Sequence, residues 1–172
     1  MKYHYKDLKL YKQLHQERNY GDTGLEYAED ILNLIRQTGA QTVLDFGSGT
    51  GSLAKSLRKR NVLIDEFDPC YPGKEKIPKE KYDLVITTDL LEHIYEDELD
   101  NIFEEMLYLK PKFMYHAIST REATILLPDK TNCHKTIKNM HWWYDRIYNL
   151  INPAAINATP KNDDCVIIKL VI

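Results

Sequence analysis

The chain has 172 residues, of which 43% are hydrophobic, and a formal net charge of −3. This length fits one domain with a single core, and the slight acidity excludes the global basic surface that non-specific nucleic-acid binding requires. Three cysteines are too few for a disulfide framework, and no stretch is apolar and long enough for a secretory signal or a membrane span. We therefore expect a soluble, cytoplasmic chain with one fold and one site.

Two helices are expected before residue 39. The first lies within residues 3–19, where apolar and aromatic side chains recur at helical spacing and predict an amphipathic flap on the domain. Its inward face consists of Leu8, Tyr11, Leu14 and His15. Thr23 and Glu26 form a capping-box pattern, which predicts that the second helix begins there, and Gly39 is placed to end it.

Strands and helices alternate along the rest of the chain. Strands are expected at residues 42–46, 61–67, 82–88, 113–119 and 165–172, the last of them paired with the region near residues 154–158. Helices are expected at residues 52–60, at residues 99–107 before Pro111, and at residues 143–151. This alternation predicts an α/β fold, a doubly wound Rossmann-like sheet with helices on both faces.

Three glycines follow the first strand at a spacing of two, as Gly47, Gly49 and Gly51. Without β-carbons the backbone can pass close to a ligand, and the following helix contributes its free N–H groups, so a nucleotide-like ligand is expected. The third glycine comes one residue too early for the dinucleotide-binding pattern. Asp45 precedes the loop, and Asp68 ends the second strand, where a carboxylate can accept hydrogen bonds from ribose hydroxyls.

This combination resembles the class I S-adenosylmethionine-dependent methyltransferases. The resemblance implies that the acid before the loop and the loop backbone hold the methionine portion, and that the acid at the strand end holds the ribose. Carried over residue by residue, the cofactor site consists of Asp45, Gly47, Gly49, Gly51, Asp68 and Thr88. Residues 1–38 would then be N-terminal helices and residues 39–172 the catalytic sheet with its helices. The plainer alternative is a tight turn at residues 47–51 and a surface turn at Asp68.

The sequence departs from that family between residues 68 and 82. Pro69, Pro72, Gly73 and Pro78 interrupt this short stretch and leave little room for the usual third strand and its helix. We therefore predict a reduced third-strand region. The acidic residue that contacts adenine in the family has no clear counterpart here.

A second group of polar residues follows the strand that ends at Thr88. If residues 89–93 are helical, Asp89, Glu92 and His93 stand at i, i+3 and i+4 and share one face. Two carboxylates and an imidazole at the carboxyl end of a strand suit a hard or borderline divalent ion such as Mg²⁺, Mn²⁺ or Fe(II). A fourth ligand would be needed.

The pattern D-x-x-E-H, followed by Ile118-Ser119-Thr120 and by Asn132-Cys133-His134, is similar to two groups of metal-dependent O-methyltransferases. One group methylates the 3′-terminal ribose of small RNAs, and the other methylates catechol intermediates in ubiquinone biosynthesis. The resemblance implies the metal ligands Asp89, Glu92, His93 and His134. The first position is commonly glutamate in those groups and is aspartate here.

Such a metal would chelate the vicinal hydroxyls of an acceptor, lower a hydroxyl pKa and aim the oxygen at the methyl group. The catalytic residues would be Asp89, His93 and His134. The alternative is structural, with Glu92 in a cap or ion pair, His93 packed under the sheet edge and His134 an ordinary loop residue.

The connection at residues 121–139 is long and polar and is expected to cover the acceptor, while Tyr20-Gly21-Asp22 is expected to close over the cofactor. The overall acidity favours a small-molecule acceptor over nucleic acid, and neither a membrane nor an oligomeric partner is indicated. Two further readings stay open. One is a metal-independent N- or O-methyltransferase with Asp89 or His93 as general base, and the other is a cofactor-binding module without catalysis.

Overall fold

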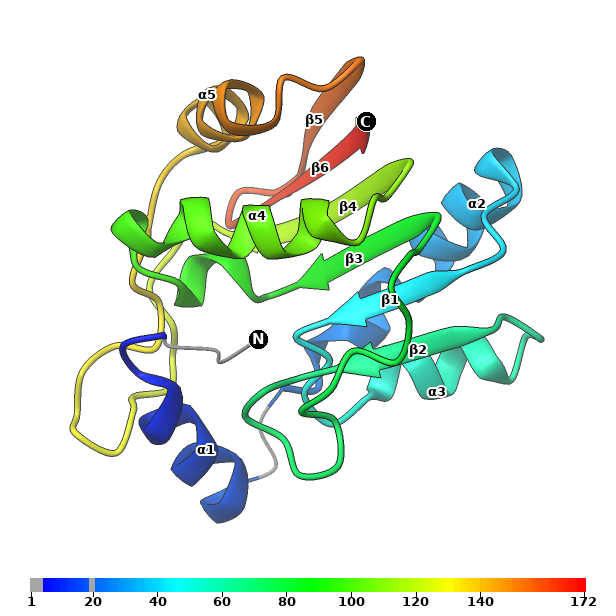
Figure 1. Cartoon of the computed structure of the whole chain (residues 1–172). Helices are drawn as coiled ribbons and strands as arrows, with labels where there is room; N and C mark the ends of the chain where they lie inside the picture. The colour runs from blue at the N-terminus through cyan, green and yellow to red at the C-terminus, as the bar shows by residue number, and fades with distance from the viewer. Residues whose placement is uncertain (1–4, 19–20) are drawn as a thin grey trace.

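The computed structural model describes residues 5–18 and 21–172 (Figure 1). One six-stranded sheet runs through the molecule in the order β2-β1-β3-β4-β6-β5. Its strands are β1 (Val43–Phe46), β2 (Ile64–Phe67), β3 (Leu84–Thr88), β4 (Phe113–Ser119), β5 (Ala155–Asn162) and β6 (Cys165–Val171). The first four are mutually parallel, and β6 is antiparallel to both β4 and β5. The predicted pairing of the last strand with the region near residues 154–158 is confirmed.

Helices cover both faces of this sheet, as predicted. The helices are α1 (Leu8–Glu17), α2 (Ala28–Thr38), α3 (Ser52–Arg58), α4 (Leu99–Tyr108) and α5 (Met140–Ile151), with 3-10 turns η1 (Thr23–Tyr27), η2 (Leu91–His93) and η3 (Glu96–Glu98). One apolar cluster joins α4 and α5 to the sheet, and the other joins η1, α2 and α3 to the opposite face. None of the described helices is long and apolar enough to cross a membrane.

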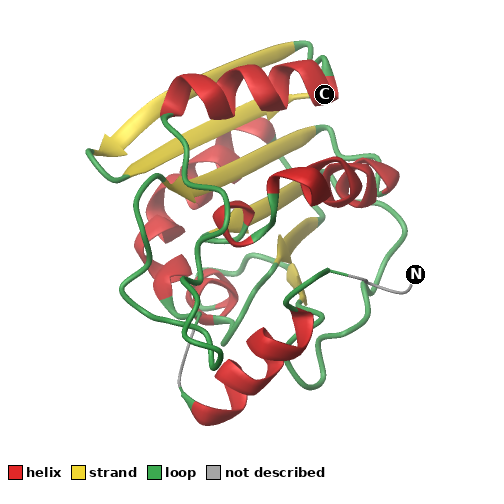
Figure 2. Cartoon of the chain, turned by 90° about the vertical axis from the view of Figure 1, so that its left-hand side faces the viewer, coloured by secondary structure: helices red, strands yellow, loops and turns green. Residues whose placement is uncertain are grey.

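Alternating side chains of the strands divide the core between the two faces. Leu44 and Phe46 of β1 pack in the cluster with α4 and α5, whereas Val43 packs in the cluster with α2 and α3. Trp143 of α5 is fully buried and Trp142 is only partly buried. Figure 2 shows α5 beside the β5–β6 hairpin and α1 at the opposite end of the molecule.

The third strand of the family is absent, which confirms the reduced region. After β2 the chain makes a turn in which the N–H of Asp68 donates to the carbonyl of Lys74 (2.9 Å). Residues 68–83 contain no strand or helix, and β2 is therefore an edge strand of the sheet.

The beginning of the second helix differs from the prediction. Thr23 lies inside η1, and neither η1 nor α2 has a side-chain hydrogen bond at its N-terminus, so the capping box does not form. Consecutive 3-10 and α turns satisfy this end of the helix instead. Gly39 ends α2 as predicted, with φ of +68° and its N–H donating to the carbonyl of Ile35 (2.9 Å).

The other boundary differences are short. Helix α1 occupies the middle of the predicted range, with Leu14 buried on its inner face, while residues 3, 4 and 19 of that range lie outside the described residues. Strand β2 begins at Ile64, three residues later than predicted, because Asn61 adopts a positive φ of 62° and continues the turn after α3.

Candidate active site

A cavity of about 490 Å³ lies at the carboxyl ends of β1 and β3, a common ligand position in open α/β sheets, and α1 forms part of its wall. In Figure 1, α1 lies beside the arrowheads of these strands. The predicted site residues that line this cavity are Asp45, Gly47, Gly49, Asp68, Thr88, Asp89, His93 and His134. Gly51 and Glu92 are not in its lining. Residues predicted for the cofactor site and residues predicted for the metal site therefore line the same cavity.

The glycine loop is closed by its own hydrogen bonds. The N–H groups of Gly47 and Ser48 both donate to the carbonyl of Phe67, at 2.7 and 3.1 Å, which fastens the loop to β2. The N–H of Thr50 donates to Gly21, and that of Gly51 to Ser48. These amides already have acceptors, so the loop offers a ligand close approach rather than a set of free donors.

Gly49 is the tightest point of the loop. Its φ is +49°, and a β-carbon there would lie 2.6 Å from the carbonyl oxygen of Gly21. Its N–H donates to Oδ2 of Asp68 (2.8 Å), and Oδ1 of the same carboxylate accepts from the N–H of Cys70 (2.8 Å). Asp68 therefore holds the loop in addition to facing the cavity, where its remaining lone pairs can accept from a ribose.

Asp45 is buried below the loop, with 1% of its surface exposed. Its Oδ1 has no hydrogen-bond partner in the described part of the chain. Burial, reinforced by the charge of Glu66, raises the pKa of Asp45 to about 7, although Lys74 opposes the shift. A cationic group of a ligand is the partner that this carboxylate lacks.

Asp89 does not begin a helix, so the prediction of one helical face for Asp89, Glu92 and His93 is wrong. The residue has a left-handed φ of +48°, and the following turn is the 3-10 helix η2, Leu91–His93. Aspartate tolerates this conformation better than most residues. The turn places Asp89 and His93 in the cavity wall and directs Glu92 into the interior.

Glu92 is fully buried, and only one of its carboxylate oxygens is satisfied. Oε1 accepts from the N–H of Ser119 (2.7 Å), while Oε2 has no hydrogen-bond partner among the described residues. Burial raises the pKa of Glu92 well above its ordinary value, and the charge of Asp89 raises it further. A proton shared with Asp89 relieves the repulsion between the two acids, and a cation would relieve it in the same way.

His93 and His134 lie side by side, with ring centroids 4.8 Å apart. Nδ1 of His93 is 3.0 Å from the carbonyl of Cys133, and Nδ1 of His134 is 2.6 Å from the carbonyl of Arg121. A carbonyl only accepts, so Nδ1 carries the proton and Nε2 is the basic nitrogen in each ring. Burial lowers both pKa values, that of His93 to about 3.

Main-chain hydrogen bonds join the connection after β4, residues 121–139, to η2, and they bring His134 close to His93. The carbonyl of Glu92 accepts from the N–H groups of Lys135 and Thr136, at 2.7 and 3.0 Å. The hydroxyl of Tyr11 on α1 donates to the carbonyl of Cys133 (2.6 Å). These contacts use main-chain carbonyl groups, which every residue has, so the amino-acid sequence does not predict them.

The two segments predicted to close over the site, residues 121–139 and 20–22, contribute residues to the cavity wall. Arg121 and Thr124 of the long connection line it, as do Gly21 and Asp22, whereas Tyr20 lies outside the described residues. In the described ranges, no three His, Cys, Asp or Glu side chains form a ready metal-binding cluster. The fit to a metal rests on the donor chemistry of Asp89, Glu92 and the two histidines.

The parallel strands, the antiparallel hairpin and the cavity beside the glycine loop form a Rossmann-like methyltransferase fold. The chain belongs to the methyltransferase domain family, whose sequence model matches residues 14–159. An uncharacterized methyltransferase of Geobacillus sp. strain WCH70 is 34% identical over 61 residues, which cover 36% of this chain and 29% of that protein. The matches to three curated relatives span 29% to 60% of their lengths.

Solved structures share the fold at low sequence identity. DhpI in complex with SAH is 15% identical, with a TM-score of 0.64 and coverage of 95% of this chain and 94% of that one. The methyltransferase domain of bacterial CtHen1 is 14% identical, with a TM-score of 0.63 and coverage of 86% and 100%. The mixed six-stranded sheet is therefore a known methyltransferase architecture.

Replacing Gly49 with alanine should weaken binding of S-adenosylhomocysteine at least about tenfold, because the new β-carbon meets the Gly21 carbonyl and shifts the loop. Isothermal titration calorimetry measures this affinity. Gly39→Ala is the matched control, since Gly39 has a similar positive φ of 68° but nothing within 4 Å of a β-carbon. Equal affinities of the two variants would contradict the role of this close approach.

Affinity for S-adenosylhomocysteine should fall as the pH drops from 8 to 6, by up to about tenfold per unit below the pKa of Asp45. The sign follows because the ligand ammonium prefers the ionised carboxylate, so binding below about pH 7 must release a proton. The other charged groups acting on Asp45 are Glu66, Lys74, Asp68 and Arg58.

The measurement is the same titration in buffers of several pH values. Asp45→Asn should bind weakly and without this slope, whereas His15→Gln, a change at another cavity residue, should keep it. A pH-independent affinity in the unmodified protein would show that the ligand does not pair with Asp45.

Proposed function

We propose that this protein transfers the methyl group of S-adenosylmethionine to a hydroxyl oxygen of a small acceptor with vicinal hydroxyls, assisted by a divalent metal ion. The observation that supports this proposal best is Glu92, a fully buried acid that lies beside a second acid, Asp89. The imidazoles of His93 and His134 lie beside each other, each with its proton directed to a carbonyl. Histidine ligands of metals are commonly oriented by such hydrogen bonds.

The residues that would hold the metal are Asp89, Glu92, His93 and His134. Two carboxylates and two neutral nitrogen donors suit Mg²⁺, Mn²⁺ or Fe(II), and a divalent charge would favour the ionised form of Glu92. When bound, the ion supplies a positive charge that lowers the pKa of a coordinated hydroxyl.

Methyl transfer forms a bond between the acceptor oxygen and the methyl carbon while the bond from that carbon to sulfur breaks. The acceptor hydroxyl must also lose its proton. Where Nε2 of His134 holds the metal, that proton would leave to solvent. In the metal-independent alternative, His134 lines the cavity with a lowered pKa that keeps it neutral near pH 7, and Nε2 would receive the proton itself. Asp89 faces the same space and favours the positive charge that then develops on the imidazole.

A small acceptor fits the cavity better than a polymer. The space is about 490 Å³ and is covered by α1 and by the connection after β4. Arg121 in its lining is paired with Asp164 at 3.4 Å, and Lys161 is paired with Glu26 at 3.0 Å. Their charges are thus offset by acids, so the opening does not present the basic track that a nucleic-acid backbone requires.

Methyl transfer from labelled S-adenosylmethionine to catechol should require Mg²⁺ or Mn²⁺ and stop on addition of EDTA. Glu92→Gln and His134→Ala should each lower this rate on the order of 100-fold or more, since both remove proposed ligands of the metal. Both variants should still bind S-adenosylhomocysteine, because neither residue holds the cofactor loop.

Glu104→Gln and His141→Ala are matched controls, since both residues are exposed and lie outside the cavity. Phenol, which lacks the second hydroxyl, should be a poor acceptor in the same assay. Methyl transfer that persists in EDTA and in Glu92→Gln would contradict the metal and favour the metal-independent alternative.

A further inference from the structure

Lys74 stands in the turn that replaces the third strand, and its side chain reaches back to the glycine loop. Its Nζ donates to the carbonyl of Gly49 (2.7 Å) and is 2.6 Å from Oε1 of Glu66. The side chains of Lys74 and Glu66 are only 16% and 15% exposed. Solvent and salt therefore screen this contact less than an ordinary surface ion pair.

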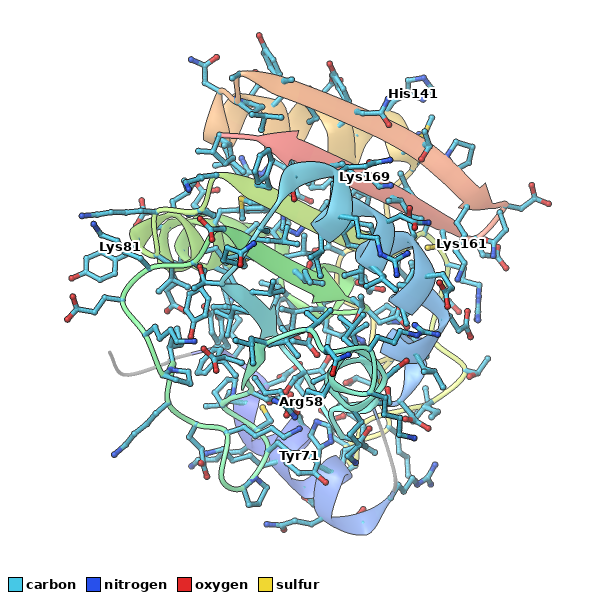
Figure 3. All side chains as sticks on the ribbon, turned by 90° about the vertical axis from the view of Figure 1, so that its right-hand side faces the viewer. Arg58, Tyr71, Lys81, His141, Lys161 and Lys169 are labelled. Atoms are coloured by element: carbon cyan, nitrogen blue, oxygen red, sulfur yellow. The ribbon has the colours of Figure 1, made fainter. Side chains whose placement is uncertain are left out.

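The surrounding turn fixes the position of Lys74. Its carbonyl accepts from the N–H of Asp68, its N–H donates to the carbonyl of Tyr71, and its ammonium lies 4.6 Å from the centroid of the Tyr71 ring. Arg58 binds the other carboxylate oxygen of Glu66 at 2.5 Å. Figure 3 labels Arg58, the last residue of α3, and Tyr71, which lies in the turn after β2.

Gly51 makes room for the ion pair. A β-carbon at this position would collide with Oε1 of Glu66 and lie 2.8 Å from Nζ of Lys74. Gly51 is absent from the cavity lining, and its φ of +77° together with this packing accounts for the third glycine. The glycine loop and the side chain of Lys74 therefore pack directly against each other.

Gly49 is consequently held on both sides of its backbone. Asp68 accepts from its N–H, and Lys74 donates to its carbonyl. We propose that Lys74 is a positioning residue for the cofactor, which holds the glycine loop in its binding conformation where the third strand of the family is missing. This inference rests on the proposed cofactor.

The charge of Lys74 has a second effect in the same place. It opposes the rise in the pKa of Asp45 that burial and Glu66 cause. Lys74 therefore favours the ionised carboxylate that would meet the ligand ammonium. Loss of the lysine should move the pH midpoint of cofactor binding upward, an effect that a purely structural role would not produce.

The test is calorimetric titration of S-adenosylhomocysteine into the full chain and its Lys74→Met variant, between pH 6 and 8. We expect affinity to fall roughly 10- to 100-fold, as for loss of a hydrogen bond from a charged donor, and the pH midpoint to rise. Lys74→Arg, which keeps the positive charge, should restore the midpoint more fully than the affinity.

Lys79→Met is the matched control. Lys79 pairs at 2.6 Å with Asp65, which lies on β2 next to Glu66, the partner of Lys74. Lys79 also lies 5.7 Å from the centroid of the Tyr82 ring, but it does not contact the glycine loop. This variant should keep its affinity within about twofold of the unmodified protein. Thermal unfolding of both variants separates loss of stability from loss of binding.

The outcomes distinguish the two proposals. If the unmodified chain does not bind S-adenosylhomocysteine, the proposed function fails. If it binds and Lys74→Met binds equally well with the same pH midpoint, the role of Lys74 is overturned. Should Lys74→Met fail to fold, the comparison of Lys74→Arg with Lys79→Arg replaces it, and weaker binding only in the former is the expected result.

Discussion

The site depends on one carbonyl group, that of Phe67 at the end of β2. It accepts from the N–H groups of both Gly47 and Ser48 and so fixes the direction in which the chain leaves β1. A reversal this tight requires positive φ at three alternate positions, which only glycine adopts without strain. From this reversal follow the depth of Asp45 below the loop and the reach of Asp68 to the Gly49 amide. The cofactor end of the cavity is therefore set by hydrogen bonds between the ends of two adjacent strands.

Most of the fold could be predicted from the sequence because it depends on local patterns. The strand at residues 113–119 and the interruption of the chain after Asp68 are both determined by neighbouring residues, and both predictions are confirmed. The capping box failed because Thr23 and Glu26 have the right spacing, whereas the chain enters α2 through a 3-10 turn. Such a choice between turn types depends on packing against α3 and β3, which the local sequence does not contain.

The candidate site could be predicted in composition but not in geometry. Asp89 and His93 were expected on one helical face, and they reach the same cavity through a left-handed residue and a 3-10 turn instead. Lys74 was not identified, because a lysine in a turn with several other lysines is indistinguishable in sequence from a solvated charge. Its role depends on the backbone of a loop more than twenty residues away.

Two buried carboxylate oxygens, Oδ1 of Asp45 and Oε2 of Glu92, lack hydrogen-bond partners among the described residues. Such groups are costly in a folded protein and are retained where a ligand completes them. Asp45 lines the cavity under the glycine loop, whereas Glu92 lies in the interior beside Asp89, which lines the cavity. The methyl donor has an ammonium and a sulfonium, and the proposed metal carries two positive charges. Burial favours the protonated form of both acids, and the positive charges of bound ligands would favour the ionised form of each.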